Sequence, residues 1–183
     1  ALTGIDAVSH AIETYVTTRR NAASCSFARE AWRLLAPNFP KVLADPTDIE
    51  ARSGMQIGAC FAGLAIENSM LGAAHALANP LTARYGTPHG QAVGLMLPHV
   101  VRFNAEAHRD WYDELPVPEG QTLIDYLTSL LEQAGLAVRL SDLQVPDNDI
   151  PQLAEDASKQ WTGTFNPRKV DANILATIYQ AAN

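Results

Sequence analysis

The chain has 183 residues, of which 47% are hydrophobic and 18% are charged, a balance typical of one folded domain rather than a disordered segment. Its net charge of −7 and its scattered Lys and Arg give no basic footprint for nucleic acid. No apolar run approaches the roughly 20 residues of a membrane span, and no basic and then hydrophobic leader opens the chain. From the charge and the hydropathy, we expect no nucleic-acid or membrane partners. Cys25 and Cys60 are far apart and form no CxxC, so we expect free thiols in a cytoplasmic protein.

The first predicted helix lies within ALTGIDAVSHAIETYV, where apolar side chains recur at steps of three and four and Thr3 can cap the first turn. Asp6 and His10 are four residues apart, which puts them on one face of that helix with Cβ atoms roughly 5–6 Å apart. This is the spacing of a chelating pair of metal ligands. It is also the spacing of an ordinary hydrogen-bonded or solvated pair, so both interpretations stay open at this point.

Two longer helical segments follow. SCSFAREAWRLLA predicts a helix that ends near Pro37 and Pro40, because proline cannot continue the ladder of backbone hydrogen bonds. The next segment begins at the capping residues Asp45 and Thr47. Small residues along it favour a buried central helix that its neighbours approach closely: Gly54, Gly58, Ala59, Ala62 and Gly63.

The segment GAAHALANPLTARYG contains a proline that has two interpretations. Pro80 either kinks this helix or starts a new one that Asn79 caps. In the following segment, Thr87 as the cap and Pro88 at the first helical position would place His89 in the first turn.

The C-terminal third carries further helix signals. Gly135 can end the amphipathic segment QTLIDYLTSLLEQ in a left-handed conformation, while Asp149 and Asp171 are predicted to cap the last two helices. The strict alternation of β-strands is almost absent. We therefore predict an all-α fold, a single helical domain without internal repeats.

Two further histidines, His75 and His89, lie among small residues that would allow close approach. Either histidine alone is more often a hydrogen-bonded core residue than a metal ligand. Together with Asp6 and His10, they give one carboxylate and three imidazoles, which can hold a divalent transition metal and leave a coordination position open. Such a set suits Fe²⁺ or Zn²⁺ and does not suit Mg²⁺ or Ca²⁺.

At these residues the sequence resembles the iron-containing, or group III, alcohol dehydrogenases. The matching segments run in family order along nearly the whole chain: TGIDAVSHAIETYV, NSMLGAAHALANPL, TPHGQAVGLMLPHVVRFNAE and WTGTFNPRKV. The resemblance implies that residues 1–183 form the C-terminal, dehydroquinate-synthase-like helical domain of such an enzyme. It also implies four metal ligands, namely Asp6, His10, His75 and His89.

In that family, an N-terminal α/β domain with a glycine-rich loop holds NAD(P), and alcohols are oxidised to aldehydes or ketones in the cleft between the domains. No GxGxxG or GGGS-type loop occurs in this sequence, so its cofactor-binding residues are unknown. We therefore interpret the chain as a truncated, metal-binding catalytic half without the nucleotide-binding domain, inactive alone. An exposed former cleft would also favour a homo-oligomer, and the small alcohol or aldehyde substrate is not identified.

Asn79 is a departure from the family pattern. Many relatives carry a second histidine four residues after the ligand that corresponds to His75, where it is implicated in proton transfer. Asn79 occupies this candidate catalytic position, but asparagine does not titrate near neutral pH, which argues against a proton relay there. The structural alternative is that Asn79 is only a helix cap before Pro80.

Two other classes of function are alternatives to a dehydrogenase. Metal-dependent phosphohydrolases on helical scaffolds carry an adjacent His-Asp pair, and this dipeptide does not occur in the chain. A non-catalytic helical module with a structural or vestigial metal site is the alternative that stays open. His99, late in a predicted helix, and His108, in a polar segment where an exposed side chain is expected, are left out of the ligand set.

Overall fold

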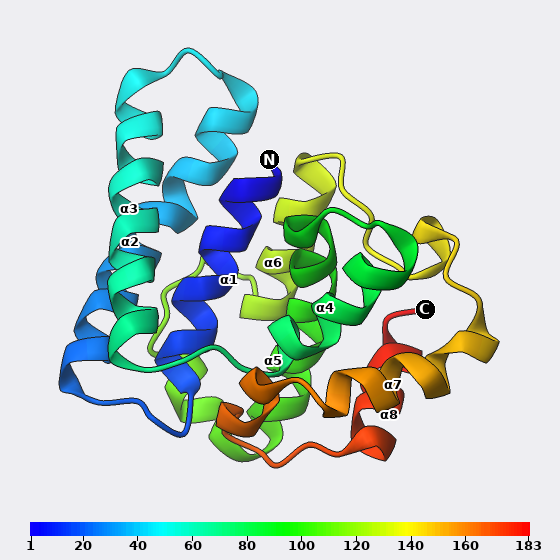
Figure 1. Ribbon diagram of the computed structural model, residues 1–183. Helices are drawn as coiled ribbons and strands as arrows, with labels where there is room; N and C mark the ends of the chain where they lie inside the picture. Colours follow the sequence, from blue (N-terminus) through cyan, green and yellow to red (C-terminus); the bar gives the residue numbers. More distant parts are fainter.

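The structure, a computed structural model, describes all of residues 1–183, and every regular element in it is a helix (Figure 1). The predicted all-α single domain is thus confirmed. The α-helices are α1 (Leu2–Val16), α2 (Ala22–Ala44), α3 (Ile49–Asn68), α4 (Ala73–Tyr85), α5 (His89–Asp113), α6 (Leu123–Gln133), α7 (Ile150–Ser158) and α8 (Ala172–Ala181). Three short 3-10 helices complete the chain: η1 (Ser141–Leu143), η2 (Asp147–Asp149) and η3 (Trp161–Phe165).

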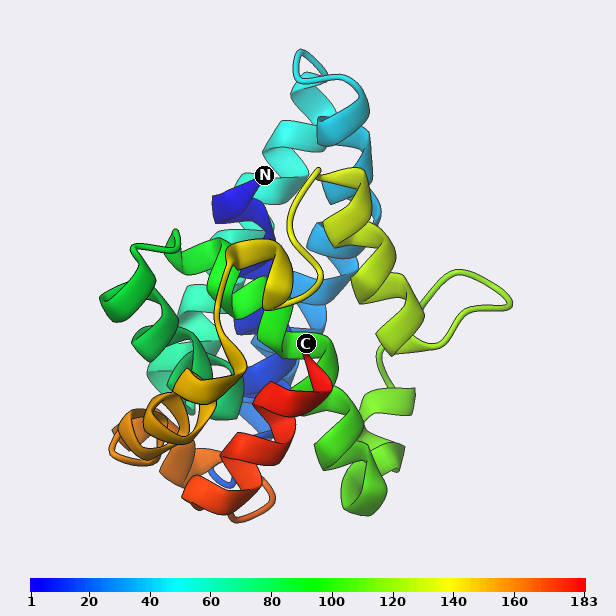
Figure 2. The same cartoon turned by 90° about the vertical axis from the view of Figure 1, so that its right-hand side faces the viewer.

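The helix α1 lies between two other parts of the fold (Figure 1). On one side it packs against the hairpin of α2 and α3, and on the other side against α5, which also contacts α4 and α6. The helices α7 and α8 pack against one another and lie in the lower part of Figure 2, with the C-terminus following α8. The helices α1, α4 and α5 therefore form the centre of the domain.

One contiguous hydrophobic core of 45 buried residues runs through these helices. The largest of its fully buried side chains include Trp32, Tyr15, Tyr179 and Phe39. Most of α1 belongs to this core, because its residues from Ala7 to Val16 are buried apart from His10. The polar side chains of α1 are consequently held on a helix that is fixed on several sides.

The helix α2 does not end near Pro37 and Pro40, as its sequence predicts, but continues to Ala44. A proline at position 40 cannot donate a backbone hydrogen bond to the carbonyl oxygen of Ala36, four residues earlier. The hydroxyl of Tyr126 in α6 donates to that oxygen instead, at 2.6 Å. A side chain from another helix therefore satisfies a group that the proline leaves without its helical partner.

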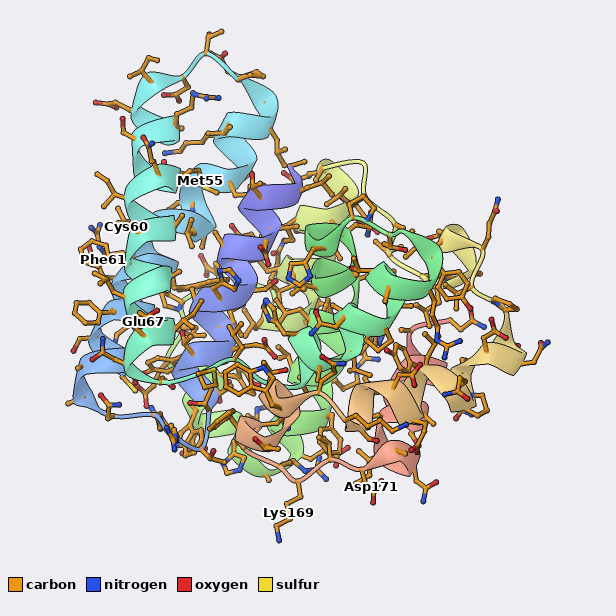
Figure 3. The ribbon with its side chains drawn as sticks, in the orientation of Figure 1. Met55, Cys60, Phe61, Glu67, Lys169 and Asp171 are labelled. Atoms are coloured by element: carbon orange, nitrogen blue, oxygen red, sulfur yellow. The ribbon has the colours of Figure 1, made fainter.

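The helix α3 begins later and is less buried than predicted. Asp48, rather than Asp45 or Thr47, is its N-cap, and the Asp48 side chain accepts a hydrogen bond from the Ala51 backbone N–H at 2.9 Å. Only small residues are buried on α3, since it packs one face against α2: Ala51, Gly54, Gly58, Ala62 and Ala65. Cys60 and Phe61 lie on its outer side (Figure 3). None of the helices alone has the length and apolar composition of a membrane span; α3 and α4 together have them, but as a pair bent by 106°.

The cap of α1 and the beginning of α5 differ slightly from expectation. Thr3 lies inside α1 and does not cap it, because the helix begins at Leu2 and its N-cap is Ala1. The helix α5 begins at His89, so this histidine is in the first turn as predicted. Thr87 forms no capping hydrogen bond to α5.

The helix ends predicted in the C-terminal third mostly agree with the structure. Gly135 adopts the left-handed conformation, with φ +65°, immediately after Ala134, the C-cap of α6. The Asp171 side chain accepts a hydrogen bond from the Ile174 backbone N–H at 2.9 Å and so caps α8. Asp149 stands at the N-cap of α7, but its carboxylate accepts a hydrogen bond from the Tyr85 hydroxyl instead of from the helix.

Candidate metal centre

The four residues predicted as metal ligands converge from three helices. Asp6 and His10 lie on α1, His75 lies in the first turn of α4, and His89 is the first residue of α5. The Nε2 atoms of His10, His75 and His89 lie 3.4, 3.5 and 3.8 Å from the same atom, Oδ1 of Asp6. Three imidazoles therefore face a single carboxylate oxygen.

The cluster has a buried inner side and an open outer side. The His75 side chain is 5% exposed, those of Asp6 and His10 are 24% exposed, and that of His89 is 41% exposed. The His10 ring stacks on the His75 ring with centroids 5.0 Å apart, and the His89 ring is tilted over His75 at 5.3 Å. Solvent or a small molecule would reach the cluster past His89.

Two buried atoms at the centre lack hydrogen-bond partners, namely Oδ1 of Asp6 and Nε2 of His75. Two ligand atoms that each lie about 2.1 Å from one ion with tetrahedral geometry are about 3.4 Å apart, close to the separations between the cluster's atoms. The donor atoms of Asp6, His10 and His75 all lie within 4.8 Å of one another, and His89 lies outside this tighter trio. The residues present thus fit a divalent cation, with His89 as the most distant donor.

Charge within the cluster is distributed between carboxylates and imidazoles. Burial raises the pKa of the Asp6 carboxyl, but the three facing imidazoles outweigh burial and lower the pKa below its ordinary value. Burial lowers the pKa of His10, and the attraction of Asp6 only partly opposes this. Burial also lowers the pKa of His75, yet the neighbouring carboxylates of Glu13 and Asp6 outweigh it and raise the pKa to about 9. The inner side of the cluster therefore stabilises a positive charge.

The buried carboxylate of Glu13 was not identified from the sequence. It is 3% exposed, and His75 Nδ1 lies 2.5 Å from its Oε2 atom. The spacing in the sequence could have indicated Glu13 as a neighbour of the cluster. Glu13 follows Asp6 by seven residues and His10 by three, which places all three on one helix face.

Asn79 lies one helical turn after His75 in α4, and the structure excludes its interpretation as a cap. The helix α4 runs without interruption through Pro80 to Tyr85, so no helix begins at this proline. The Asn79 side chain instead donates a hydrogen bond from Nδ2 to Oε1 of Gln160, at 2.9 Å. Asn79 is half-buried, and its side-chain oxygen, Oδ1, takes no part in the hydrogen bond to Gln160.

The two histidines left out of the ligand set lie elsewhere on α5. His99 is ten residues after His89, which is about 15 Å along a helix. His108 interrupts the helical backbone with φ −133° and ψ 36°, and its ring stacks on Trp111 with centroids 4.3 Å apart. The His108 side chain is half-buried, so the prediction that it is exposed is wrong.

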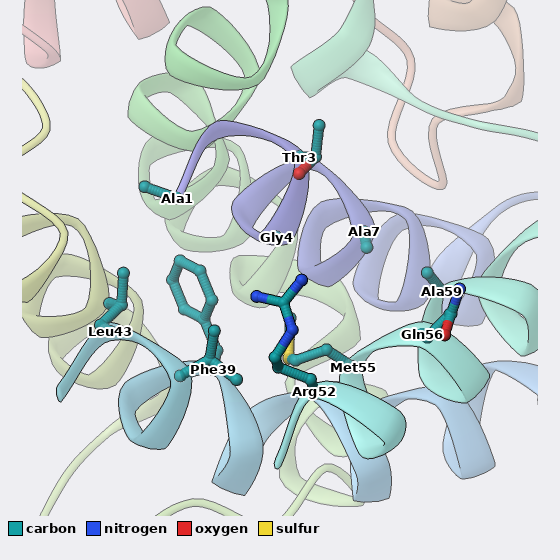
Figure 4. A pocket seen from close by; sticks show the side chains of 11 residues that line it. Ala1, Thr3, Gly4, Ala7, Phe39, Leu43, Arg52, Met55, Gln56 and Ala59 are labelled. Carbon is teal, nitrogen blue, oxygen red and sulfur yellow. The ribbon is translucent and has the colours of Figure 1, made fainter. Parts of the chain in front are cut away.

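A separate pocket lies between α1, α2 and α3 (Figure 4). Its lining includes Phe39, Arg52 and Met55, with Gly4 and Ala7 from α1. None of the four clustered residues lines it. The pocket and the cluster are thus different sites on α1.

Fold and cluster together define an all-helical domain with a histidine-rich site between three of its helices. The chain belongs to the Fe-containing alcohol dehydrogenase family, because the model of that family's C-terminal region matches residues 1–183. This confirms the resemblance recognised in the sequence.

Individual relatives agree with this assignment. The chain is 33% identical to 1,3-propanediol dehydrogenase of Klebsiella pneumoniae and 34% identical to lactaldehyde reductase of Escherichia coli, each over 194 residues that cover 100% of this chain and 50% of the relative. A crystal structure of 1,3-propanediol oxidoreductase superposes with a TM-score of 0.92 at 33% identity, covering 100% of this chain and 51% of that one. Sulfoacetaldehyde reductase from Bifidobacterium kashiwanohense, solved in complex with NAD⁺, gives 0.90 at 28% identity, covering 99% and 49%. The chain spans about half the length of these relatives.

Proposed function

We propose that this domain is the metal-binding, catalytic half of an NAD(P)-dependent alcohol dehydrogenase that interconverts a small alcohol and its aldehyde or ketone. The observation that carries the proposal is the convergence of three imidazole Nε2 atoms on Oδ1 of Asp6. Asp6, His10, His75 and His89 would hold Fe²⁺ or Zn²⁺. Membership of the family supports this chemistry, since relatives carry the names of propanediol dehydrogenase and lactaldehyde reductase.

The side chains of the cluster would perform distinct tasks. A bound divalent cation stabilises the negative charge that develops on an alcohol oxygen during hydride loss. Asp6 contributes the negative charge that anchors a cation among three neutral imidazoles. The buried His75 fixes the inner side of the site, while the more exposed His89 borders the side from which substrate would enter.

Asn79 would orient the substrate rather than move a proton. An amide both donates and accepts hydrogen bonds, and it does not titrate near neutral pH. Because Asn79 Nδ2 donates to Gln160, the Asn79 side-chain oxygen stays available to accept a hydrogen bond from a substrate hydroxyl. We propose this position, one turn from His75, as the substrate-orienting residue of the site.

The cofactor and further partners are also part of the proposal. We propose that NAD(P) binds outside these 183 residues, because they contain no glycine-rich phosphate-binding loop. Adding NADH to this chain should leave the NADH fluorescence unchanged, and a saturable change would contradict the proposal. We further propose that the protein is cytoplasmic and forms a homo-oligomer. Light scattering coupled to gel filtration tests the oligomeric state directly.

Calorimetric titration with Zn²⁺, and with Fe²⁺ under anaerobic conditions, tests the metal site. The 183-residue chain should bind one ion, and both Asp6→Asn and His75→Ala should abolish tight binding. His108→Gln is the matched control, because it removes a histidine that stacks on Trp111 outside the cluster. Absence of binding by the unaltered chain, or equal binding by Asp6→Asn, would refute the proposal.

A second titration separates a catalytic site from a structural one. In the Co²⁺-loaded chain, a short alcohol such as 1,3-propanediol should change the visible spectrum if the site is open to ligands, as catalytic sites are and closed structural sites are not. An unchanged spectrum at saturating alcohol would instead favour the non-catalytic helical module.

A further inference from the structure

The carboxylate of Glu13 is completely engaged inside the domain. Its Oε1 atom accepts a hydrogen bond from the Ala74 backbone N–H at 2.7 Å, and its Oε2 atom contacts His75 Nδ1 at 2.5 Å. No Lys or Arg forms an ion pair with it, and both Glu13 and His75 are nearly inaccessible to solvent. Burial of a carboxylate costs free energy unless the group is paired. The contacts with Ala74 and His75 offset this cost for Glu13.

The first turn of α4 depends on side chains from distant parts of the chain. Its N-cap is Gly72, which has no side chain to accept a hydrogen bond. Glu13 supplies an acceptor for the Ala74 N–H, while Oδ1 of Asn166 lies 3.4 Å from the Ala73 nitrogen. A Cβ at Gly72 would lie 3.0 Å from the Glu13 carboxylate, so glycine permits this close approach. Negative charge near a helix N-terminus is also favourable.

The contact with Glu13 determines which nitrogen of His75 faces the cluster. Carboxylate oxygens act as hydrogen-bond acceptors, so at 2.5 Å from Oε2 the Nδ1 atom of His75 is assigned as the N–H donor of this contact. The opposite nitrogen, Nε2, is the buried atom without a partner that lies 3.5 Å from Asp6 Oδ1. The ring is thus held with Nε2 directed at the centre of the cluster.

We propose that Glu13 is a positioning residue of the metal centre, which holds the His75 ring with Nδ1 protonated so that Nε2 is presented as a ligand. This inference rests on the proposed metal site. Carboxylates that orient a ligating histidine in this way contribute about 10- to 100-fold to metal affinity in other proteins.

The substitution Glu13→Gln tests this inference while conserving size. A glutamine can keep its oxygen on the Ala74 N–H, but its NH₂ group then faces His75 Nδ1, which must become an acceptor. The ring proton moves to Nε2, the ligating atom. We expect Zn²⁺ to bind about 10- to 100-fold more weakly in calorimetric titration. In the Zn²⁺-loaded protein, the Nδ1–H proton of His75 should exchange slowly with solvent in the unaltered chain and much faster in Glu13→Gln, where no carboxylate accepts its hydrogen bond.

Asn166→Ala is the matched control, because it removes the other acceptor at the start of α4 without touching His75. It should lower the melting temperature and keep both the zinc affinity and the slow exchange of the His75 Nδ1–H proton. If Glu13→Gln does not fold, Glu13→Asp keeps the charge but withdraws the carboxylate by one methylene, and the same loss of affinity is expected.

The outcomes separate this inference from the metal site itself. Unchanged zinc affinity in Glu13→Gln, or in Glu13→Asp where that variant replaces it, overturns the positioning role while the metal site stands. An equal loss in Asn166→Ala also overturns it, since the effect would then come from the start of α4 in general. If the unaltered chain binds no zinc, the metal site and the role of Glu13 are both refuted.

Discussion

Gly90 in α5 packs so closely against the backbone carbonyl of Leu2 in α1 that a side-chain carbon at position 90 would overlap this oxygen. The contact joins the first turns of the two helices that carry Asp6 and His89. A backbone atom cannot move aside as a flexible side chain can. The absence of a Cβ at position 90 is therefore what lets His89 approach within 3.8 Å of Asp6.

Gly90→Ala should weaken both the fold and the cluster. The added methyl group must push α1 and α5 apart, and overpacking of this kind costs about 1–3 kcal/mol in the free energy of unfolding. The same displacement moves His89 away from Asp6, so zinc binding should weaken on the order of tenfold, which corresponds to about 1.4 kcal/mol. Urea unfolding and calorimetric titration measure the two effects.

Gly63→Ala is the matched control on α3, where an added Cβ meets nothing within 4 Å. Replacement of a helical glycine by alanine at such an open position should stabilise the protein by about 0.5–1 kcal/mol. Its zinc affinity should be unchanged. Equal zinc affinities of Gly90→Ala and the unaltered chain would show that the close approach of α5 to α1 does not position His89.

Tyr126→Phe is predicted to destabilise α2 through a single hydrogen bond. The Ala36 carbonyl oxygen has no helical donor, since position 40 is proline, and the Tyr126 hydroxyl is its partner. Removal of the hydroxyl leaves a buried acceptor unpaired, which costs about 1–3 kcal/mol. Urea denaturation followed by circular dichroism measures this loss.

A double-mutant cycle with Pro40→Ala tests the cause. Alanine at position 40 restores a backbone N–H that can donate to Ala36, so Tyr126→Phe should then cost clearly less than in the unaltered chain. The same cost in both backgrounds would mean that the loss comes from packing of the ring and not from the carbonyl.

The sequence predicts the elements whose cause is local and fails where the cause is distant. The spacing of Asp6 and His10, the left-handed Gly135 and the Asp171 cap depend on neighbouring residues and agree with the structure. The continuation of α2 through its prolines depends on Tyr126, which is 90 residues from Ala36, and no local pattern contains this information.

The same distinction applies to the candidate site. The residue types of Asp6, His10, His75 and His89, together with the family resemblance, were sufficient to predict that these side chains converge. The role of Glu13 depends instead on the start of α4, 61 residues away, where the first backbone N–H groups of the helix lack an intrahelical partner. An acidic residue in a helical pattern is usually solvated, so its burial becomes visible only in the structure.

His99 is predicted to make the protein less stable in acid. Its Nδ1 atom is buried without a hydrogen-bond partner. Burial, with a smaller contribution from the charge of Arg102, lowers the His99 pKa from 6.5 to about 4. Above pH 6.5 the ring is neutral in both the folded and the unfolded chain. Between pH 6.5 and 4, only the unfolded chain binds the proton, so the free energy of unfolding falls as the pH falls.

Urea unfolding at pH 7 and pH 5 measures this loss. His99 should account for about 1–2 kcal/mol of the decrease, a value discounted because the ring is partly exposed. His99→Gln cannot titrate, so this part of the decrease should disappear, and the variant should resist acid better relative to its own stability at pH 7. If both proteins lose the same free energy between the two pH values, then His99 is not the group responsible, and protonation elsewhere in the fold causes the acid sensitivity.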